Sequence, residues 1–142
     1  MTPQPEAFAM LKCAMMADFS INLPDEPGEL SRLTEMLREA SINLVALWGY
    51  GPGTGHARFY CVPEQAEQFR SFANTAGYQV HEGKTLYLSG TDEGGALVET
   101  LQKIAAAGIN LQAIEAVAIL GEFGCFLWAD EENWDALANL LI

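Results

Sequence analysis

The sequence is poor in basic residues: it has 7 Lys and Arg against 19 Asp and Glu, which gives a formal net charge of −12. Proteins that bind nucleic acids neutralise phosphates with clustered cations. Anionic membrane surfaces repel an acidic chain for the same electrostatic reason. The composition therefore predicts that neither nucleic acid nor a membrane surface is a partner.

Long apolar runs and metal-ligating patterns are also missing. The sequence has no run of 18 apolar residues, which argues against a membrane-spanning helix, and its N-terminus lacks the basic region of a secretory signal. The 3 Cys have no C-x-x-C spacing, and the 2 His have no Cys at ligand spacing. We therefore predict no metal site, no cofactor, and buried thiols in a reducing compartment, with the cytoplasm as the expected location.

What the sequence does have is an internal repeat at an offset of 67 residues. Residues 21–47 and 88–114 are identical at 9 of 27 positions without a gap. The offset also aligns Phe59 with Phe126 further along the chain. Two copies are too few for a solenoid. They predict a pair of small, related units.

Both copies show the same order of hydrophobic patterns. Alternating apolar residues predict strands, apolar residues three and four apart predict helices, and Gly- or Pro-containing segments separate them. The expected elements of the first copy are strands at 19–23, 42–50, 57–62 and 78–80, a helix with its apolar positions at 30–40 and a helix from 63. Those of the second copy are strands at 86–88, 109–120 and 125–128, a helix with its apolar positions at 97–104 and a helix from 130. This strand–helix–strand–strand–helix–strand order is the ferredoxin-like pattern.

The predicted fold is therefore α+β, with two ferredoxin-like βαββαβ units packed side by side. We expect an N-terminal extension at 1–15, a first domain at 16–82 and a second at 83–142. The second copy reaches residue 142 without a clear fourth strand. The segment 7–15 can fill that sheet edge, form a helix or make an intersubunit contact, and the sequence leaves these alternatives open.

Two observations favour association with a second chain. A unit of about 60 residues buries only about 60% of its unfolded surface and is marginal alone. In the second strand, Ile42, Leu44 and Ala46 share one face, and Val45 and Leu47 make the opposite face apolar as well. Helices cover only one face of such a sheet, so we expect a homodimer.

The first copy resembles the ACT domain, a small regulatory βαββαβ module. The resemblance rests on a strand, the loop Asp25-Glu26-Pro27-Gly28-Glu29-Leu30, an amphipathic helix and then Ile42-Asn43. The second copy keeps Asp92, Gly95, Leu97, Ile109 and Asn110 but has Gly94 in place of the proline. ACT domains commonly bind amino acids where two of them pack together, and the chain resembles stand-alone tandem-ACT proteins.

The resemblance and the chemistry of the loop give one set of candidate residues. Backbone N–H groups at a helix N-terminus attract a carboxylate, a glycine there lets a ligand approach the backbone, and Asp or Asn can hold an ammonium. The candidate ligand-binding residues are Asp25, Glu26, Gly28, Glu29, Leu30, Asn43, Asp92, Glu93, Gly95 and Asn110. The alternative interpretation is that the acids only cap helices and the asparagines only satisfy backbone groups.

Two other segments near the expected site have structural interpretations. The glycine-rich segment 49–55 lacks the Lys-Ser/Thr of a phosphate loop, so we interpret it as a mobile hairpin tip. The neighbouring aromatic residues are expected in a core or an interface: Trp48, Tyr50, Phe59 and Tyr60. The Trp48 indole is a candidate wall for a pocket.

The predicted function is a non-catalytic regulatory protein that binds a small amino acid at an interface between ACT-like units, with a separate enzyme as a possible partner. No Ser, Cys or Lys nucleophile stands beside a recognisable base, so we predict that the chain is not an enzyme. Two alternatives stay open: a small ferredoxin-like enzyme or enzyme subunit acting on an amino-acid-derived metabolite, and a ligand-free interaction module. Because the first copy has the complete loop, we expect a single site to be built around it.

Overall fold

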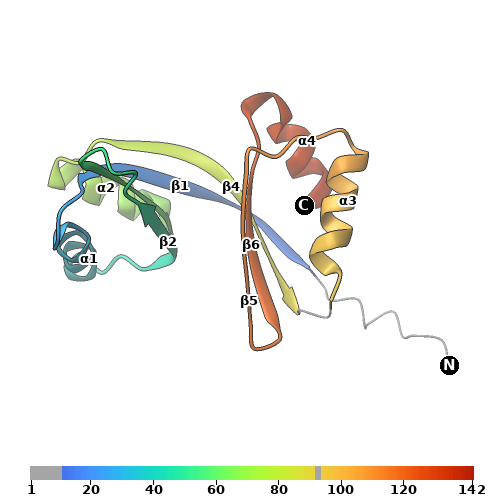
Figure 1. The fold of residues 1–142 in the computed structure, drawn as a ribbon, viewed down its shortest axis with the longest axis horizontal. Coiled ribbons are helices and arrows are strands. Elements are labelled where there is room, and N and C mark those ends of the chain that lie inside the picture. Colours follow the sequence, from blue (N-terminus) through green and yellow to red (C-terminus); the bar gives the residue numbers. More distant parts are fainter. Residues whose placement is uncertain (1–10, 92–93) are drawn as a thin grey trace. The chain divides into compact units, whose positions relative to one another are not determined.

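The computed structural model describes residues 11–91 and 94–142. Within these residues the chain forms six strands and four helices (Figure 1). In chain order they are β1 (Lys12–Pro24), α1 (Glu29–Glu39), β2 (Leu44–Tyr50), β3 (His56–Pro63), α2 (Ala66–Ala76), β4 (Val80–Thr91), α3 (Ala96–Ala106), β5 (Ala113–Ile119), β6 (Glu122–Trp128) and α4 (Glu131–Leu141). The predicted order of strands and helices is therefore confirmed.

The chain divides into two compact units. The N-terminal unit is Ala17–Gly83; the C-terminal unit is Lys84–Ile142 together with the residues up to Met16. The hydrogen-bonded strand order is β2-β3-β1-β4-β6-β5. Each unit thus contains four strand segments and two helices in the ferredoxin-like arrangement. The fold class predicted from the sequence, α+β with two ferredoxin-like units, is confirmed.

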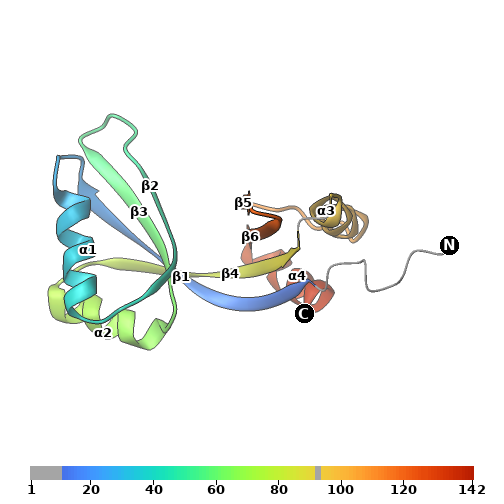
Figure 2. The ribbon, with the colours of Figure 1, turned by 90° about the horizontal axis from the view of Figure 1, so that it is seen from below.

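The fourth strand of the C-terminal unit comes from the beginning of the chain. β1 lies next to β4 in the strand order, and its first residues, 12–16, belong to the C-terminal unit. Its remaining residues belong to the N-terminal unit, as do the first residues of β4. Figure 2 shows β1 and β4 as the two long neighbouring strands. Of the alternatives that the sequence left open for 7–15, residues 12–15 therefore take the strand.

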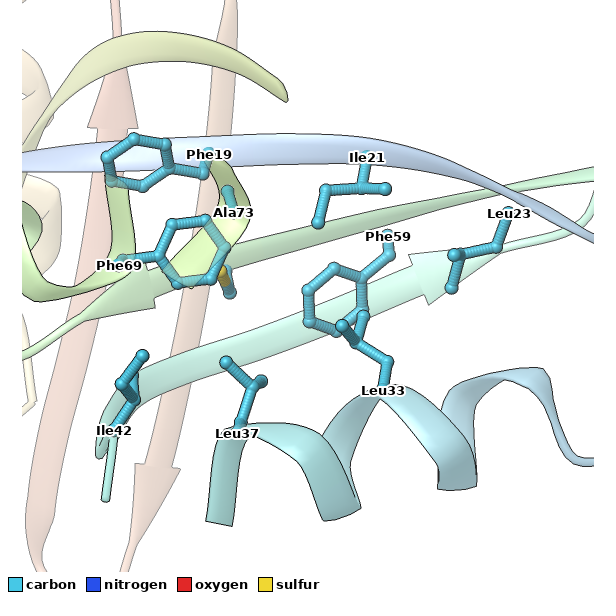
Figure 3. Packing of buried hydrophobic residues seen from close by; sticks show 10 residues of the cluster. Phe19, Ile21, Leu23, Leu33, Leu37, Ile42, Phe59, Phe69 and Ala73 are labelled. Atoms are coloured by element: carbon cyan, nitrogen blue, oxygen red, sulfur yellow. The ribbon is translucent and has the colours of Figure 1, made fainter. Parts of the chain in front are cut away.

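The core of the N-terminal unit joins one face of its strands to α1 and α2. Leu33 and Leu37 come from α1, and Phe69 and Ala73 come from α2, in both cases four residues apart and therefore on one side of the helix. Figure 3 shows these side chains pointing toward the strands. The strand contribution consists of alternate residues: Phe19, Ile21 and Leu23 of β1, with Phe59 and Cys61 of β3.

The C-terminal unit repeats this core with different side chains. Leu86 and Leu88 of β4 take the places of Phe19 and Ile21, at the offset of 67 residues. The other buried members are Ile104, Ile109, Phe123, Cys125, Leu127, Trp134 and Leu137. Strand β5 contributes no residue to this cluster.

A register shift between Leu44 and Ala46 changes which side chains of β2 face the helices. Leu47 pairs with Cys61, whose side chain is in the core, whereas Ala46 pairs with Val62. The prediction that Ala46 lies on the same face as Leu44 is therefore wrong. An extra residue in one strand reverses the alternation beyond it, and a β-bulge cannot be read from hydrophobic periodicity alone.

The repeat offset also changes, by one residue, in the third strand of each unit. Ile21 pairs with Phe59, and its counterpart Leu88 pairs with Cys125. Phe59 therefore corresponds to Cys125 and not to Phe126, which corrects the constant offset expected from the sequence. The physical reason is that the connection between the second and third strands is shorter in the C-terminal unit, with two residues (120–121) against five (51–55).

Among the residues that the structure describes, no helix combines the length and the apolar composition that crossing a membrane requires.

Phe69 provides a test of the N-terminal core. Its side chain is fully buried, and its ring centroid lies 4.6 Å from that of Phe19. We expect Phe69→Ala to lower the free energy of unfolding by about 3–5 kcal/mol, because the change removes apolar contact and leaves a cavity. Urea denaturation followed by circular dichroism measures this, with Phe69→Leu as the milder control. A loss below about 1 kcal/mol would show that the site is not tightly packed.

An ion pair between α2 and β4 makes stability depend on pH. Arg70 Nε lies 2.6 Å from Glu82 Oε1, and Arg70 Nη2 lies 2.8 Å from Glu82 Oε2. The hydrogen bonds from Arg70 hold the pKa of Glu82 below its ordinary value of 4.5. A carboxylate with a lowered folded-state pKa stabilises the fold above its unfolded-state pKa, and this contribution is lost as the pH falls through the folded-state value.

We therefore expect Glu82→Gln to lower the melting temperature slightly at about pH 7 and to lower it less at about pH 3, because Glu82 is increasingly protonated as the pH falls toward its lowered pKa. Differential scanning calorimetry at the two pH values measures this. The exposed Glu64→Gln is the control for removing one negative charge. An effect of Glu82→Gln that is equal at both pH values would contradict the ionic explanation.

Candidate functional site

Helix α1 begins with a glycine and without a side-chain cap. The N-cap residue Gly28 has a φ of 91°, a left-handed conformation that is unfavourable for residues with a Cβ. In the described part of the chain, no side-chain hydrogen bond caps this helix. Helix α4 differs, because the Asp130 carboxylate accepts a hydrogen bond from the Asn133 backbone N–H at 2.9 Å. The capping interpretation of Asp25 and Glu26 is therefore not what α1 shows.

A cavity of about 410 Å³ lies beside this helix N-terminus. Its volume falls in the range of about 300–1,000 Å³ that is typical of small-molecule pockets. Four predicted site residues line it: Asp25, Glu26, Glu29 and Leu30. The others come from the ends of β1 and β2 and the beginning of β3, namely Leu23, Pro24, Leu47, Trp48, Gly49, Tyr50, Gly51, Ala57, Arg58 and Phe59. The structure thus brings four residues of the first loop to one concave surface, whereas Pro27 and the predicted site residue Gly28 do not border it.

The larger hollow of about 950 Å³ in the N-terminal unit is a weaker candidate. It is a wide surface groove along the C-terminal part of α1 and the whole length of α2, lined by residues such as Met36 and Phe72. No predicted site residue borders it, and it does not contain the N-terminus of α1. We therefore place the candidate site at the smaller cavity.

The hairpin that joins β2 to β3 closes one side of the smaller cavity. The Asp25 backbone N–H donates a hydrogen bond to the Gly55 carbonyl oxygen at 3.0 Å. Gly51 lies against the Asp25 carboxyl group, since a Cβ at residue 51 would lie 2.8 Å from Asp25 Cγ and closer still to Oδ2. The segment interpreted from the sequence as a mobile hairpin tip is thus tied to the Asp25 loop.

The cavity combines negative charge with an apolar side. Asp25, Glu26 and Glu29 contribute carboxylates, while Leu23 and Phe59 are core residues only 6% and 2% exposed. Arg32 Nη1 lies 3.4 Å from Glu29 Oε1, but the Arg32 side chain is largely exposed, so solvent screens this ion pair. The N-terminus of α1 adds the positive end of a helix dipole. A zwitterion with an apolar side chain matches this set of groups.

The two asparagines lie elsewhere in their units. Asn43 directly precedes β2, and its carbonyl oxygen accepts a hydrogen bond from the Glu64 backbone N–H at 2.9 Å. It does not border the cavity. Since a strand rises about 3.3 Å per residue, Asn43 lies roughly 17 Å along β2 from Trp48, which borders the cavity. Asn110 is exposed ahead of β5 in the same way. Asp25 and Asn43 therefore do not form one site within the N-terminal unit.

The second copy repeats the helix start but not the hairpin. Gly95 is the N-cap of α3, with a φ of 107°. Asp92 and Glu93, two of the predicted site residues, lie outside the described residues. Only Leu120 and Gly121 separate β5 from β6, both with positive φ, as in a tight hairpin turn. The counterpart of the glycine-rich wall is therefore a two-residue turn.

The aromatic residues expected near the site divide between the two faces of the sheet. Phe59 is buried in the core. Trp48 stacks on Tyr60, with ring centroids 5.5 Å apart and planes 3° from parallel. Tyr60 stands between Phe59 and Cys61, which face the helices, so Tyr60 and the Trp48 indole face the other way. Trp48 borders the cavity, and its indole stacks on Tyr60.

The cysteines lie outside the candidate site. Cys61 and Cys125 are fully buried, and Cys13 is half-buried. Burial raises the pKa of the Cys61 thiol to about 12 and that of Cys125 to about 11. Thiols with such pKa values are poor nucleophiles at neutral pH. Within the described residues, no group of three or more His, Cys, Asp and Glu side chains is arranged to hold a metal ion.

Sequence reasoning did not assign Leu47, Gly51 or Phe59 to the cavity. The order of the strands in the sheet, and not a sequence motif, could have indicated that these residues border the cavity. β1 and β3 are antiparallel neighbours, with Leu23 opposite Ala57. The hairpin before β3 therefore returns to the sheet end where β1 leads into the Asp25 loop.

The two units define a class of fold, the ferredoxin-like α+β type, and solved structures share it. No family model matches the sequence, and no curated protein matches it. Protein BT0572 from Bacteroides thetaiotaomicron has a TM-score of 0.78 at 20% identity, over 94% of this chain and 88% of that one. The ligand-free regulatory subunit of aspartate kinase from Thermus thermophilus has a TM-score of 0.65 at 15% identity, over 96% and 97% of the two chains.

The regulatory subunit of aspartate kinase from Thermus flavus is a further example, with a TM-score of 0.55 at 15% identity over 94% of each chain. Sequence identities of 15–20% establish a similarity of fold alone. Because it extends over almost the whole of both chains, the similarity includes both units and not one of them alone.

The contact between Gly51 and Asp25 can be tested by a double-mutant cycle. We expect Gly51→Ala to lower the free energy of unfolding by about 1–3 kcal/mol, because the added methyl group collides with the Asp25 carboxyl group. In an Asp25→Gly background the same change should cost much less, since the colliding group is gone. Chemical denaturation of the four proteins measures the coupling. Additive effects would show that residue 51 does not press on Asp25.

Proposed function

We propose that this chain is a non-catalytic regulatory protein that binds a small amino acid. The observation that carries the proposal is the cavity of about 410 Å³ at the uncapped N-terminus of α1. An open helix N-terminus, carboxylates and an apolar side are together the groups that an amino acid requires. A ligand-free interaction module would have a closed Asp25 loop, and the open cavity argues against that alternative.

The ligand carboxylate would meet backbone N–H groups beside Gly28. Nothing lies within 4 Å of the place where a Cβ would be built on Gly28, so the approach to the backbone is open. The ligand ammonium would meet the Asp25 carboxylate. Its side chain would extend toward Leu23, Leu47 and Phe59. Three carboxylates and the single cation Arg58 border the cavity, so a modest apolar side chain fits the space better than a second acidic group.

We place the ligand at an interface between ACT-like units, with the Asp25 loop of one unit as its main contact. Asp25 and Asn43 of the same unit are too far apart for one small ligand. A ligand that also uses an asparagine would have to take it from another unit or from the second copy in a homodimer. The first copy has both the complete loop around Asp25 and the hairpin that closes one side of the cavity. We therefore propose the primary site in the first copy.

The similar folds support a regulatory role. Two of the structures described above are regulatory subunits of aspartate kinase. By this analogy of fold, the chain would act on a separate enzyme and not through chemistry of its own. Regulation of this kind requires that the ligand bind one packing of the units more tightly than the other, since only differential affinity shifts an equilibrium.

The test is thermal shift and titration calorimetry against the twenty amino acids. A ligand present at 100 times its dissociation constant should stabilise the fold by about 2.7 kcal/mol. Asp25→Asn should weaken binding at least about tenfold, because it removes the charge that meets the ammonium. Asn43→Ala should weaken binding if the interface supplies that asparagine, and Asn110→Ala is the matched control in the second copy. The absence of any amino acid binding below the millimolar range would refute the proposal.

A further inference from the structure

The wide groove on the helical side of the N-terminal unit has an apolar floor. Met36 of α1 and Phe72 of α2 line it, and both are only half-buried. The Phe72 ring centroid lies 5.9 Å from that of Phe69 and 6.2 Å from that of Tyr78. The Tyr78 hydroxyl donates a hydrogen bond to Met36 Sδ at 3.7 Å. These contacts with the core hold the floor in position, so a partner would not have to order it on binding.

The shape of the groove suits a helix. On α2 the groove follows residues 68, 72, 75 and 76, whose spacing places them on one side of that helix. At a rise of about 1.5 Å per residue these positions extend over about 12 Å. Amphipathic helices of partner proteins bind with their apolar face in grooves of this kind. A partner helix of about ten residues, or roughly three turns, matches the length of the groove.

The charge of the groove has one sign. Among the described residues that line it, the charged ones are Glu39 and Glu67, and none is Lys or Arg. Helix α1 ends at Glu39 and α2 at Ala76, so the negative ends of two helix dipoles also border the groove. Arg70 of α2 is held by Glu82 through two hydrogen bonds. The groove therefore matches an occupant that has an apolar face and positive charges beside it.

The same charges argue against two other occupants. A second copy of the chain would place its own Glu39 and Glu67 against those of the first, and juxtaposed like charges are unfavourable. An anionic membrane surface would be repelled by the acidic rim. A protein helix that has Lys or Arg on both sides of an apolar stripe meets neither objection.

We propose that this groove is the docking site for a basic amphipathic helix of a partner protein. The apolar face of that helix lies on Met36 and Phe72, and its Lys or Arg side chains lie beside Glu39 and Glu67. The inference rests on the proposed function in one respect, since it supplies the surface through which the chain would act on a separate enzyme. A single helix of three turns buries less than a standard interface of about 1,200–2,000 Å², so we expect a dissociation constant of about 10–100 µM for the isolated helix.

A synthetic peptide tests the groove with the full chain. The probe is a fluorescein-labelled amphipathic peptide of about 14 residues, built from Leu on one helical face and Lys on the other. Fluorescence anisotropy at about 150 mM salt, which screens long-range attraction, measures its dissociation constant. The double variant Glu39→Lys with Glu67→Lys should weaken binding about tenfold or more, because it reverses the charge of the rim. The matched control is Glu99→Lys with Glu122→Lys, which changes the net charge equally at exposed positions of the C-terminal unit.

A second pair of variants tests the apolar floor. Met36→Ala should weaken peptide binding about threefold or more, because it removes apolar contact from the groove. Val98→Ala is its control, since Val98 is 56% exposed on α3 and lies outside the groove. Circular dichroism and melting temperature verify that each variant is folded. Because Met36→Ala and the charge variants alter different groups, a variant that fails to fold leaves the other to decide.

Three outcomes would overturn the inference. The first is a peptide that does not bind below about 1 mM, or a Leu/Glu peptide of the same pattern that binds equally well. The second is a loss of binding that is as large in the C-terminal controls as in the groove variants, which would show unspecific attraction to an acidic protein. The third is self-association of the chain that Met36→Ala abolishes in sedimentation equilibrium, which would place a second copy in the groove. The peptide titrations contain no amino acid, so their failure and the failure of amino-acid binding are distinguishable.

Discussion

The pairing of β1 with β4 is the constraint on which the rest of the structure depends. These strands have 13 and 12 residues, about twice the length of an average strand, because each of them serves both units. Phe19 and Ile21 of β1 belong to the N-terminal core, whereas Cys13 of the same strand packs against the C-terminal core. Val80 and Leu86 of β4 divide in the same way. A slip of one residue in this pair would turn apolar side chains out of both cores at once.

The two repeats begin their first helix in the same way but differ in the hairpin that lies beside it. Gly28 and Gly95 both begin a helix with positive φ, so the backbone requirement for glycine is the same in both copies. In the N-terminal unit the glycine-rich hairpin reaches the Asp25 loop and encloses a cavity with it. In the C-terminal unit the hairpin is a turn of two residues. The unequal pair expected from the sequence thus has a structural cause in the hairpin, in addition to the missing proline.

Periodicity and the repeat predicted the order of elements, both helix–strand cores and the loop that borders the cavity. These features depend on neighbouring residues in the sequence, or the same sequence pattern occurs in both copies. The position of β1 was not predictable in the same way, since residues 12–16 pair with a segment far along the chain. The face of Trp48 was missed because one irregular residue in β2 reverses the alternation. The motif named Asn43 together with Asp25, but a motif gives no distance, and the length of β2 separates them.

The sharing of β1 also affects how the chain folds as it is synthesised. The N-terminal unit contains its four strand segments once β4 has emerged, whereas the C-terminal unit must join the start of the chain to elements that are made last. Closing a loop of this length costs conformational entropy before any contact compensates for it, and such non-local pairing is slow. The N-terminal unit with its extended β1–β4 ribbon can form first and then serve as the template on which α3, β5, β6 and α4 assemble. We therefore expect the N-terminal unit to fold before the C-terminal unit, which residues 12–16 complete.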